Sequence, residues 1–403
     1  MAWKKLNPTM VAGTGLLATA LCFQIGAASA ETPEAFNTLP PELKALYDGV
    51  EDTLQPGAYD DFKMPEKPWK WCHSESYQGN PWRVSTTNEL KRLADIYKDK
   101  GWVESFEMSD SNGDVSRQIS QIRSFIDKGC SIITSFAGSS TALNEAIKAA
   151  YDAGIPFVTG AGAVTSPYAI NVDSNYVKFG QDLAQAIVDD LGDKGGNVLR
   201  VEGIAGSPLV AQQKAGADKA FDSADNVKVI RDVNGNWSAN VTKTVVLQTL
   251  ATSPQPIDAV WTSGSEARIV AEAFKQAGRP VPLITGSISG DALGYWNENQ
   301  DEFRFAGGAL MPTWTSQTLF RVGVRTLEGQ EPKLNIIMVP VPEVKQDELG
   351  SWYQDCMTPA SSSIFPVAPE DPLPPQLMND YFKKPEAIAE FDYSATPDPC
   401  AGQ

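Results

Sequence analysis

Residues 131–159 read SIITSFAGSSTALNEAIKAAYDAGIPFVT, and this stretch decides the fold. The first residues of this stretch, together with the preceding cysteine, form an apolar run, so a buried strand is predicted for Cys130–Phe136. Ala142–Ala153 follows with the composition of a helix, and Pro156–Thr159 is predicted to be a second short strand. A strand, a helix and a strand in this order predict a βαβ unit with parallel strands.

The same pattern returns later in the chain. Residues 258–285 read DAVWTSGSEARIVAEAFKQAGRPVPLIT, which is a strand, a helix of similar length, a proline and a strand. Two copies of this pattern predict an α/β protein with two similar lobes in tandem, each built on a parallel sheet.

Alternating strands and helices extend outward from both copies. Before the first copy, strands are predicted at Trp69–Glu75 and Val103–Met108, and helices at Trp82–Lys100 and Val115–Lys128. After a join near Asp173, helices are predicted at Val177–Leu191, Ala211–Asp222, Asn240–Leu250, Ala267–Ala277 and Ser316–Leu327, and strands at Asn197–Glu202, Val227–Val233, Ala259–Ser263, Pro282–Thr285 and Phe303–Pro312. A last strand is predicted at Asn335–Val344, where Pro340 and Pro342 suit an edge or a crossing segment.

The two ends of the chain depart from this pattern. Met1–Ala30 has the features of a secretory signal peptide, because Lys4 and Lys5 precede an apolar run and residues 28–30 are small. A transmembrane anchor is the alternative, but several glycines and Gln24 interrupt the apolar run. Residues 31–68 form a polar extension with one short helix, and from Gln346 onward the chain is rich in proline, which predicts an irregular surface tail.

The charge balance excludes several classes of function. The 403 residues include 33 Lys or Arg and 50 Asp or Glu, a net charge of −17, which is unfavourable for binding nucleic acid or anionic lipid. His73 is the one histidine, which argues against His-rich metal sites and most Ser-His or Cys-His catalytic pairs. The run Gly160–Ala163 lacks the third glycine of a dinucleotide fingerprint, and no phosphate-binding P-loop is present. No cofactor, metal or nucleic-acid partner is therefore expected.

Four cysteines follow the signal segment, and an even count in an exported chain favours disulfides. Three pairings are possible. Cys72 and Cys130 each lie at the start of strands that would be neighbours in the sheet, while Cys356 and Cys400 bracket the tail. We therefore predict the bonds Cys72–Cys130 and Cys356–Cys400.

Polar and aromatic residues follow the first strand, where open α/β sheets bind ligands. Glu75 and Ser76 end that strand, and Asn80, Trp82 and Arg83 open the next helix. Helix capping explains Asn80, but Trp82 and Arg83 have no structural role at an exposed helix start. An indole ring and a guanidinium are suited to a small hydroxylated ligand, because the ring stacks on it and the guanidinium donates to its oxygens.

The second lobe offers a comparable aromatic residue. Trp237 follows a strand within the segment Asn234-Gly-Asn-Trp-Ser238. A tryptophan in such a loop is seldom a core residue, so Trp237 is predicted to face the cleft.

These residues resemble the type I periplasmic substrate-binding proteins of sugar ABC importers, the group that includes ribose-binding protein. The resemblance covers residues 69–340, and it is carried by residues 80–83, 110–122, 139–143, 154–156 and 203–207, by the helix with Gly216 and by the Trp237 loop. It implies two Rossmann-like lobes joined by three hinge crossings, and a ligand held between lobes that close on it. Such proteins are not enzymes and deliver their ligand to an inner-membrane permease.

The resemblance also divides the chain. It places residues 69–174 and 310–336 in an N-terminal lobe and residues 175–309 and 337–345 in a C-terminal lobe. Residues 31–68 and 346–403 are then extensions outside the two lobes.

The sugar site of the family maps onto this chain only in part. Asn80, Trp82 and Arg83 match the family's asparagine and stacking positions, and Trp237 matches the aromatic residue of the second lobe. Elsewhere the family's charged or amide side chains are replaced, at positions that correspond to Gly162, Gln213, Gly264, Ser287 and Met311. The pocket is therefore expected to be larger and less polar than a ribose site. A deoxysugar, a glycoside and an aromatic compound are further candidate ligands.

The resulting expectation is a monomeric periplasmic protein that captures a sugar or sugar-like small molecule for an ABC importer. A less polar ligand, or delivery to a sensor instead of a permease, is the first alternative. An exported hydrolase with Glu75 and Asp173 as an acid pair is the second, although nothing in the sequence places a nucleophile beside a base.

Overall fold

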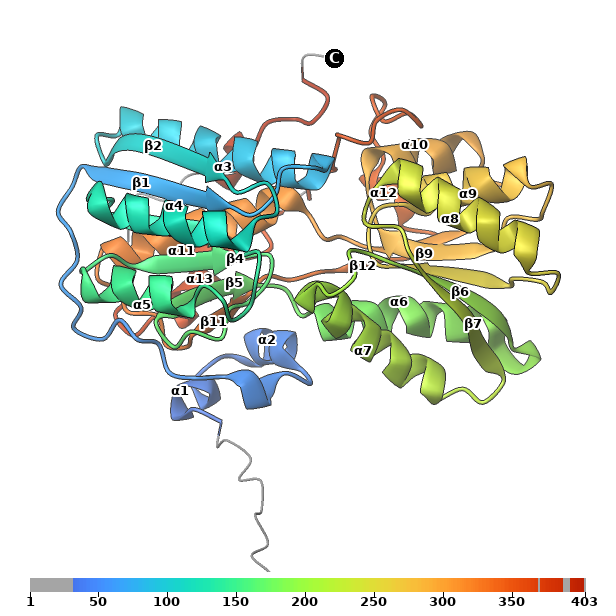
Figure 1. Cartoon of the computed structure of the whole chain (residues 1–403), viewed down its shortest axis with the longest axis horizontal. Coiled ribbons are helices and arrows are strands. Elements are labelled where there is room, and N and C mark those ends of the chain that lie inside the picture. Colours follow the sequence, from blue (N-terminus) through green and yellow to red (C-terminus); the bar gives the residue numbers. More distant parts are fainter. Residues whose placement is uncertain (1–31, 369, 387–391, 402–403) are drawn as a thin grey trace, which may run out of the picture. The chain divides into compact units, whose positions relative to one another are not determined.

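The computed structural model describes residues 32–368, 370–386 and 392–401, and the expected signal segment lies outside these ranges. Two six-stranded sheets with helices on both faces form the molecule (Figure 1), so the predicted fold class is confirmed. Among the described residues, no helix combines the length and the apolar character needed to cross a membrane.

The first sheet has the order β11-β5-β4-β3-β1-β2, and all of its pairs are parallel. Its strands are β1 (Trp69–Glu75), β2 (Val103–Asp110), β3 (Ile132–Phe136), β4 (Phe157–Gly160), β5 (Ala169–Asp173) and β11 (Ile336–Met338). The helices packed around it are α3 (Pro81–Asp99), α4 (Val115–Asp127), α5 (Asn144–Asp152) and α11 (Pro312–Leu327).

The second sheet has the order β12-β10-β9-β8-β6-β7, and only the β10–β12 pair is antiparallel. Its strands are β6 (Gly196–Glu202), β7 (Val227–Asn234), β8 (Ala259–Thr262), β9 (Leu283–Ser287), β10 (Phe305–Gly308) and β12 (Glu343–Val344). Its helices are α6 (Tyr176–Leu191), α7 (Pro208–Asp222), α8 (Ala239–Thr252), α9 (Ala267–Gln276) and α10 (Gly290–Glu298). The two sheets repeat one topology, as the two similar sequence stretches predict.

The chain passes between the sheets after β5, after β10 and after β11, and these are the three crossings that the resemblance implies. The last crossing corrects a prediction, because Asn335–Val344 is not one strand. Residues up to Met338 extend the first sheet, and Glu343 begins β12 of the second, so the crossing lies later than the expected boundary at residue 336. Pro340 and Pro342 lie between the two strands, where a missing N–H prevents continuous pairing.

Helix α10 was not predicted from the sequence, because its glycines weaken the helical pattern. The structure gives the reason for these glycines. A Cβ atom on Gly290 would lie 2.9 Å from backbone and side-chain atoms of residues 361–364, and one on Gly294 would lie 2.5 Å from the backbone of Thr358. The glycines therefore allow the C-terminal tail to pack directly against α10.

The tail itself differs from the expected surface segment. It contains the short helices α12 (Leu349–Trp352) and α13 (Pro375–Asp380) and a 3₁₀ turn at Tyr393–Ala395. Phe365, Leu373 and Met378 are buried and belong to the same hydrophobic cluster as the two sheets. Apolar residues scattered among prolines have neither helical nor strand periodicity, so their burial could not be predicted from spacing.

The N-terminal extension also packs on the first lobe. It contains α1 (Glu34–Asn37), α2 (Pro41–Lys44) and 3₁₀ turns at Ala45–Tyr47 and Glu51–Thr53. The buried Tyr47 hydroxyl donates to the Ile336 carbonyl at 2.8 Å, and the buried Tyr59 hydroxyl donates to the Tyr168 carbonyl at 2.7 Å. These bonds satisfy polar groups that would otherwise be buried without partners.

Both predicted disulfides are present. Cys72 on β1 is bonded to Cys130, which precedes β3, and Cys356 is bonded to Cys400 across the tail. The pairing of β1 with β3 brings the first two cysteines together, which is the geometry that the strand order predicted.

Candidate functional site

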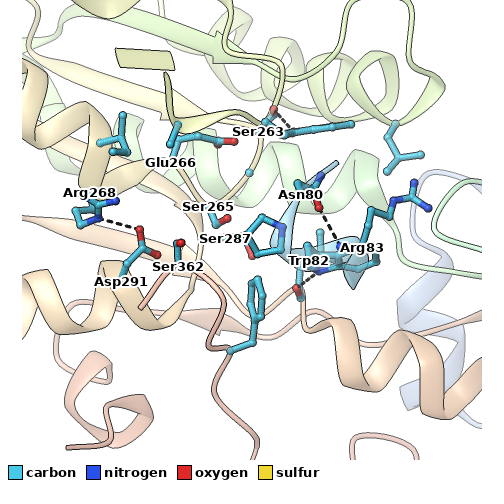
Figure 2. Close-up of a pocket in the computed structure, with 18 of the residues that line it drawn as sticks. Asn80, Trp82, Arg83, Ser263, Ser265, Glu266, Arg268, Ser287, Asp291 and Ser362 are labelled. Carbon is cyan, nitrogen blue, oxygen red and sulfur yellow. Dashed lines mark hydrogen bonds and ion pairs between the residues drawn. The ribbon is translucent and has the colours of Figure 1, made fainter. Parts of the chain in front are cut away.

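A pocket lies where the beginning of α3, the loops after β8 and β9, and the helix α7 meet (Figure 2). Its volume of about 180 Å³ is more than ten times the roughly 10–15 Å³ that one water molecule needs. Seven of the predicted ligand residues line it, namely Asn80, Trp82, Arg83, Gln213, Trp237, Gly264 and Ser287. They come from both lobes, so the fold assembles one cavity from residues far apart in the chain.

The wall from the first lobe is fixed by the start of α3. The Asn80 side-chain oxygen accepts a hydrogen bond from the Arg83 backbone N–H at 2.9 Å, so Asn80 caps the helix. The Arg83 guanidinium lies 3.2 Å from Glu75 Oε1 and 5.2 Å from the centre of the Phe136 ring. These contacts hold Arg83 in place at the edge of the pocket, where its side chain is 13% exposed.

Trp82 joins this wall to the second crossing. Its indole N–H donates to the Leu310 carbonyl at 3.0 Å, and Leu310 itself lines the pocket. The hydrogen bond fixes the ring, so one indole face can be presented to a ligand without loss of rotamer freedom on binding.

The wall from the second lobe is dominated by Trp237. Trp237 has a φ of +50° and follows Asn236 at +56°, a left-handed conformation that is uncommon for a bulky residue. Its N–H donates to the Ser263 hydroxyl at 3.0 Å. Backbone strain of this kind persists where the surroundings enforce it, and it is concentrated at functional sites.

Gly264 makes room for that ring. A Cβ on Gly264 would lie 2.7 Å from Trp237 Cδ1 and 2.9 Å from a carboxylate oxygen of Glu266. A Cβ on Gly203, on the neighbouring loop, would lie 2.2 Å from the same indole. A glycine at position 264 is therefore required by the Trp237 ring and by Glu266.

Two buried polar side chains of the pocket have an atom without a hydrogen-bond partner in the described part of the chain. Gln213 donates from Nε2 to the Ser263 carbonyl at 3.0 Å, but its Oε1 is unpaired, and so is the hydroxyl of Ser287. Gln213 is held close to the pocket because α6 and α7 touch at Gly180, where a Cβ would lie 1.9 Å from the Gln213 carbonyl oxygen. An unpaired buried group costs about 1–3 kcal/mol, which a ligand hydroxyl can recover.

A charged cluster lies at the far end of the pocket, where Figure 2 shows Glu266, Arg268 and Asp291. Arg268 is paired with Asp291, with Nε 2.9 Å from Oδ2, and with Glu272 on its own helix. Glu266 is 7% exposed. Burial, together with the nearby charge of Asp291, raises the pKa of Glu266 from 4.5 to about 7.

This raised pKa predicts how stability changes with pH. The folded protein holds a proton on Glu266 that the unfolded chain releases above about pH 4.5, so this contribution to stability is lost as the pH rises through 7. Burial raises the pKa of Asp173 to about 7 as well, in the same direction. We expect the free energy of unfolding to fall between pH 5 and pH 8, and Glu266→Gln to reduce this fall.

Denaturant unfolding at four pH values measures this change. Glu298→Gln is the control, because Glu298 is exposed at the end of α10 and lies outside the charged cluster. Parallel pH profiles for the wild type and Glu266→Gln would contradict the assignment.

Four predicted ligand residues do not line the pocket. Glu75 is fully buried and accepts from Arg83 and from the Tyr77 backbone N–H, so it positions Arg83 instead. Ser76 is buried, and its carbonyl accepts from Ser111 and Gly113.

The other two are replaced in the lining by their neighbours. Gly162 donates its N–H to Asp173 at 3.2 Å, and Ala161 lines the pocket. Met311 is buried before α11, and Leu310 lines the pocket. Neighbouring residues point in different directions, and Ala161 and Gly162 also have positive φ angles, so a resemblance without a register could not choose between these neighbours.

Several lining residues were missed. Tyr176 and Leu209 begin helices of the second lobe, and Ser362 and Phe365 come from the C-terminal tail. Local sequence held no signal for the last two, because the tail reaches the pocket through tertiary packing alone.

The hydrolase alternative finds no support in the geometry. Glu75 is engaged with Arg83, and Asp173 accepts from the backbone N–H groups of Gly162 and Ala163, and neither carboxylate lines the pocket. Within the described ranges, no group of three or more His, Cys, Asp or Glu side chains could hold a metal ion.

Comparison with known proteins supplies the family. A family model described as a periplasmic binding protein domain matches residues 74–307, more than half of the chain. The xylitol-binding protein of Mycolicibacterium smegmatis is 28% identical over 177 residues, which are 43% of this chain and half of that protein. The galactofuranose-binding protein YtfQ of Escherichia coli is 26% identical over 218 residues, which are 52% of this chain and 67% of that protein.

A solved structure shows the same fold. The solute-binding protein of an ABC transporter from Thermobispora bispora superposes with a TM-score of 0.67 at 24% identity, covering 74% of this chain and 91% of that one. The match of the family model, together with the two lobes and the pocket between them, shows that the chain belongs to the periplasmic binding protein domain family.

Proposed function

We propose that this protein is the solute-binding component of an ABC importer and that it binds a sugar or polyol in the pocket between its lobes. One observation carries the proposal: two indole rings, Trp82 and Trp237, line the pocket from opposite lobes beside buried polar atoms that lack partners.

The chemistry of this lining fits a hydroxylated ligand. Trp82 and Trp237 can contact the C–H faces of a small ring, because an indole offers a large apolar surface that can be buried against them. Gln213 Oε1 and the Ser287 hydroxyl can pair with ligand hydroxyls, and so can the Asn80 amide nitrogen, because the Asn80 oxygen is used for the helix cap. The xylitol-binding and galactofuranose-binding relatives support the same class of ligand.

Apolar side chains also form part of the pocket. Leu209, Ile269 and Phe365 contribute apolar surface, and Arg268 is engaged with Asp291 and Glu272. We therefore propose a ligand with few charged groups, such as a polyol, a deoxysugar or a neutral furanose, and an aromatic metabolite as the second candidate.

Ligand binding would favour the closed arrangement of the lobes. The lobes are connected by three segments, so a ligand that touches both walls binds the closed state better and shifts the population toward it. The closed protein would then be recognised by an inner-membrane permease. The signal segment at Met1–Ala30, the location in the periplasm and a monomeric state belong to this proposal.

The proposal is tested with purified residues 31–403 and a panel of polyols, pentoses, hexoses, furanoses, deoxysugars, glycosides and aromatic acids. We expect one of the sugar or polyol classes to raise the melting temperature by several degrees and to change tryptophan fluorescence, since Trp82 and Trp237 line the pocket. Shifts with aromatic acids alone would overturn the sugar assignment.

A further inference from the structure

The pocket has a third wall that belongs to neither lobe. Ser362 and Phe365 line it, and both lie in the tail, beyond the last residue that the family model matches, at 307. Figure 2 shows Ser362 beside Asp291, across the cavity from Asn80. Phe365 is 6% exposed and lines the cavity, so the residue is packed into the structure.

This wall is anchored firmly on the second lobe. The Gly290 N–H at the start of α10 donates to the Ile364 carbonyl at 2.8 Å, and the two glycines of α10 permit the close approach. The Ser361 hydroxyl lies 3.2 Å from the Cys356 carbonyl and 3.1 Å from the Thr358 hydroxyl. Residues 356–365 therefore have a defined conformation, and Phe365 has a fixed place.

The following residues are anchored on the first lobe. The Tyr393 hydroxyl donates to the Ala368 carbonyl at 3.1 Å, and the indole N–H of Trp314 on α11 donates to the Tyr393 hydroxyl at 3.1 Å. Asp371 forms an ion pair with Arg321, which also lies on α11; Asp371 Oδ2 is 3.0 Å from the guanidinium of Arg321. The Cys356–Cys400 bond closes this segment into one loop, which contacts both lobes beside the pocket.

Ser363 belongs to the same segment of the tail, and it lies close to the beginning of α3. It borders a shallow hollow together with Gln78, Asn80 and Val84, all from the segment that begins the first-lobe wall. Residues 362–365 thus pass directly over the line where the two lobes meet.

We infer that residues 358–368 are a specificity wall, in which Phe365 contacts the ligand and limits the site to one small ring or a short polyol. The inference rests on the proposed function, because it concerns the ligand of the same pocket. A substituent that extends from the ligand toward the tail would collide with the buried Phe365 ring, whose backbone is held in place by the hydrogen bond from α10 to the neighbouring Ile364 carbonyl. Extended glycosides and disaccharides are therefore rejected.

The experiment compares Phe365→Ala with Leu373→Ala in the full mature chain. Leu373 is the matched control, because it is a buried apolar residue of the same tail that does not line the pocket. Dissociation constants are measured by calorimetry for the best small ligand of the panel and for its larger glycoside.

For Phe365→Ala we expect about tenfold weaker binding of the small ligand and at least tenfold tighter binding of the glycoside. Leu373→Ala should keep both constants within about twofold of the wild type, even if its melting temperature falls. Unchanged constants in Phe365→Ala would overturn the inference while leaving the proposed function intact.

A wild-type protein that binds nothing in the panel would overturn the proposed function instead. Acrylamide quenching of tryptophan fluorescence then decides the inference without a ligand, because removal of a ring that lines the same pocket as Trp82 and Trp237 would open that pocket to the quencher. Increased quenching in Phe365→Ala but not in Leu373→Ala supports the wall, and equal quenching in all three proteins overturns it.

Discussion

Trp237→Ala is expected to weaken ligand binding by about 30-fold or more, which corresponds to at least ~2 kcal/mol, while the protein stays folded. The ring lines the pocket, is held by a hydrogen bond to Ser263, and fills the space over Gly203 and Gly264. Its removal deletes the second-lobe aromatic surface. Alanine keeps a Cβ and therefore the same left-handed strain at position 237, and the indole is only partly buried, so stability should change little. Calorimetric titration with the panel ligand measures the loss.

Trp102→Ala is the control for this change. Trp102 is a partly buried indole that packs against Trp69 and Tyr97, away from the pocket. It should lower the melting temperature without a change in affinity. Equal affinities for the wild type and Trp237→Ala would remove Trp237 from the site and, with it, the main support for binding between the lobes.

Removal of the Cys72–Cys130 bond is expected to lower the free energy of unfolding by about 2–4 kcal/mol. The bond spans 58 residues and links two buried positions, one on β1 and one just before the neighbouring strand β3, so its loss increases the freedom of the unfolded chain. The double variant Cys72→Ala with Cys130→Ala, unfolded by denaturant in oxidising buffer, measures the effect.

The double variant Cys356→Ala with Cys400→Ala separates this effect from that of the tail. Its bond spans 44 residues and closes the loop that carries Phe365, so we expect altered ligand affinity together with a loss of stability. Unfolding free energies that are identical with and without the Cys72–Cys130 bond would contradict the first expectation.

Much of the fold could be predicted because its signals are local. The apolar runs of β1 and β3 and the helical spacing in α4 and α5 are each contained in a dozen or so residues. The short helix α10 shows the limit, since its glycines resist a helical prediction and are explained only by the tail that packs on them.

Part of the candidate site could also be predicted from local sequence. Asn80, Trp82, Arg83 and Trp237 could be assigned because each follows a strand, at the edge where parallel sheets bind ligands. Choosing Leu310 over Met311, or Ala161 over Gly162, requires the direction of each side chain, which depends on backbone conformation at the crossings.

The two α/β lobes, the disulfide partners and the two tryptophans that line the pocket could therefore be predicted from sequence alone. Hydrophobic periodicity and the order of strands and helices can be recognised within short stretches of sequence, without knowing which other segments pack against them. Three features follow from tertiary contacts instead: Glu75 positions Arg83, Gly264 leaves space for the Trp237 ring, and Phe365 lines the pocket. Each of these depends on contact between segments tens to hundreds of residues apart or on the exact path of a loop, and no local pattern in the sequence encodes that.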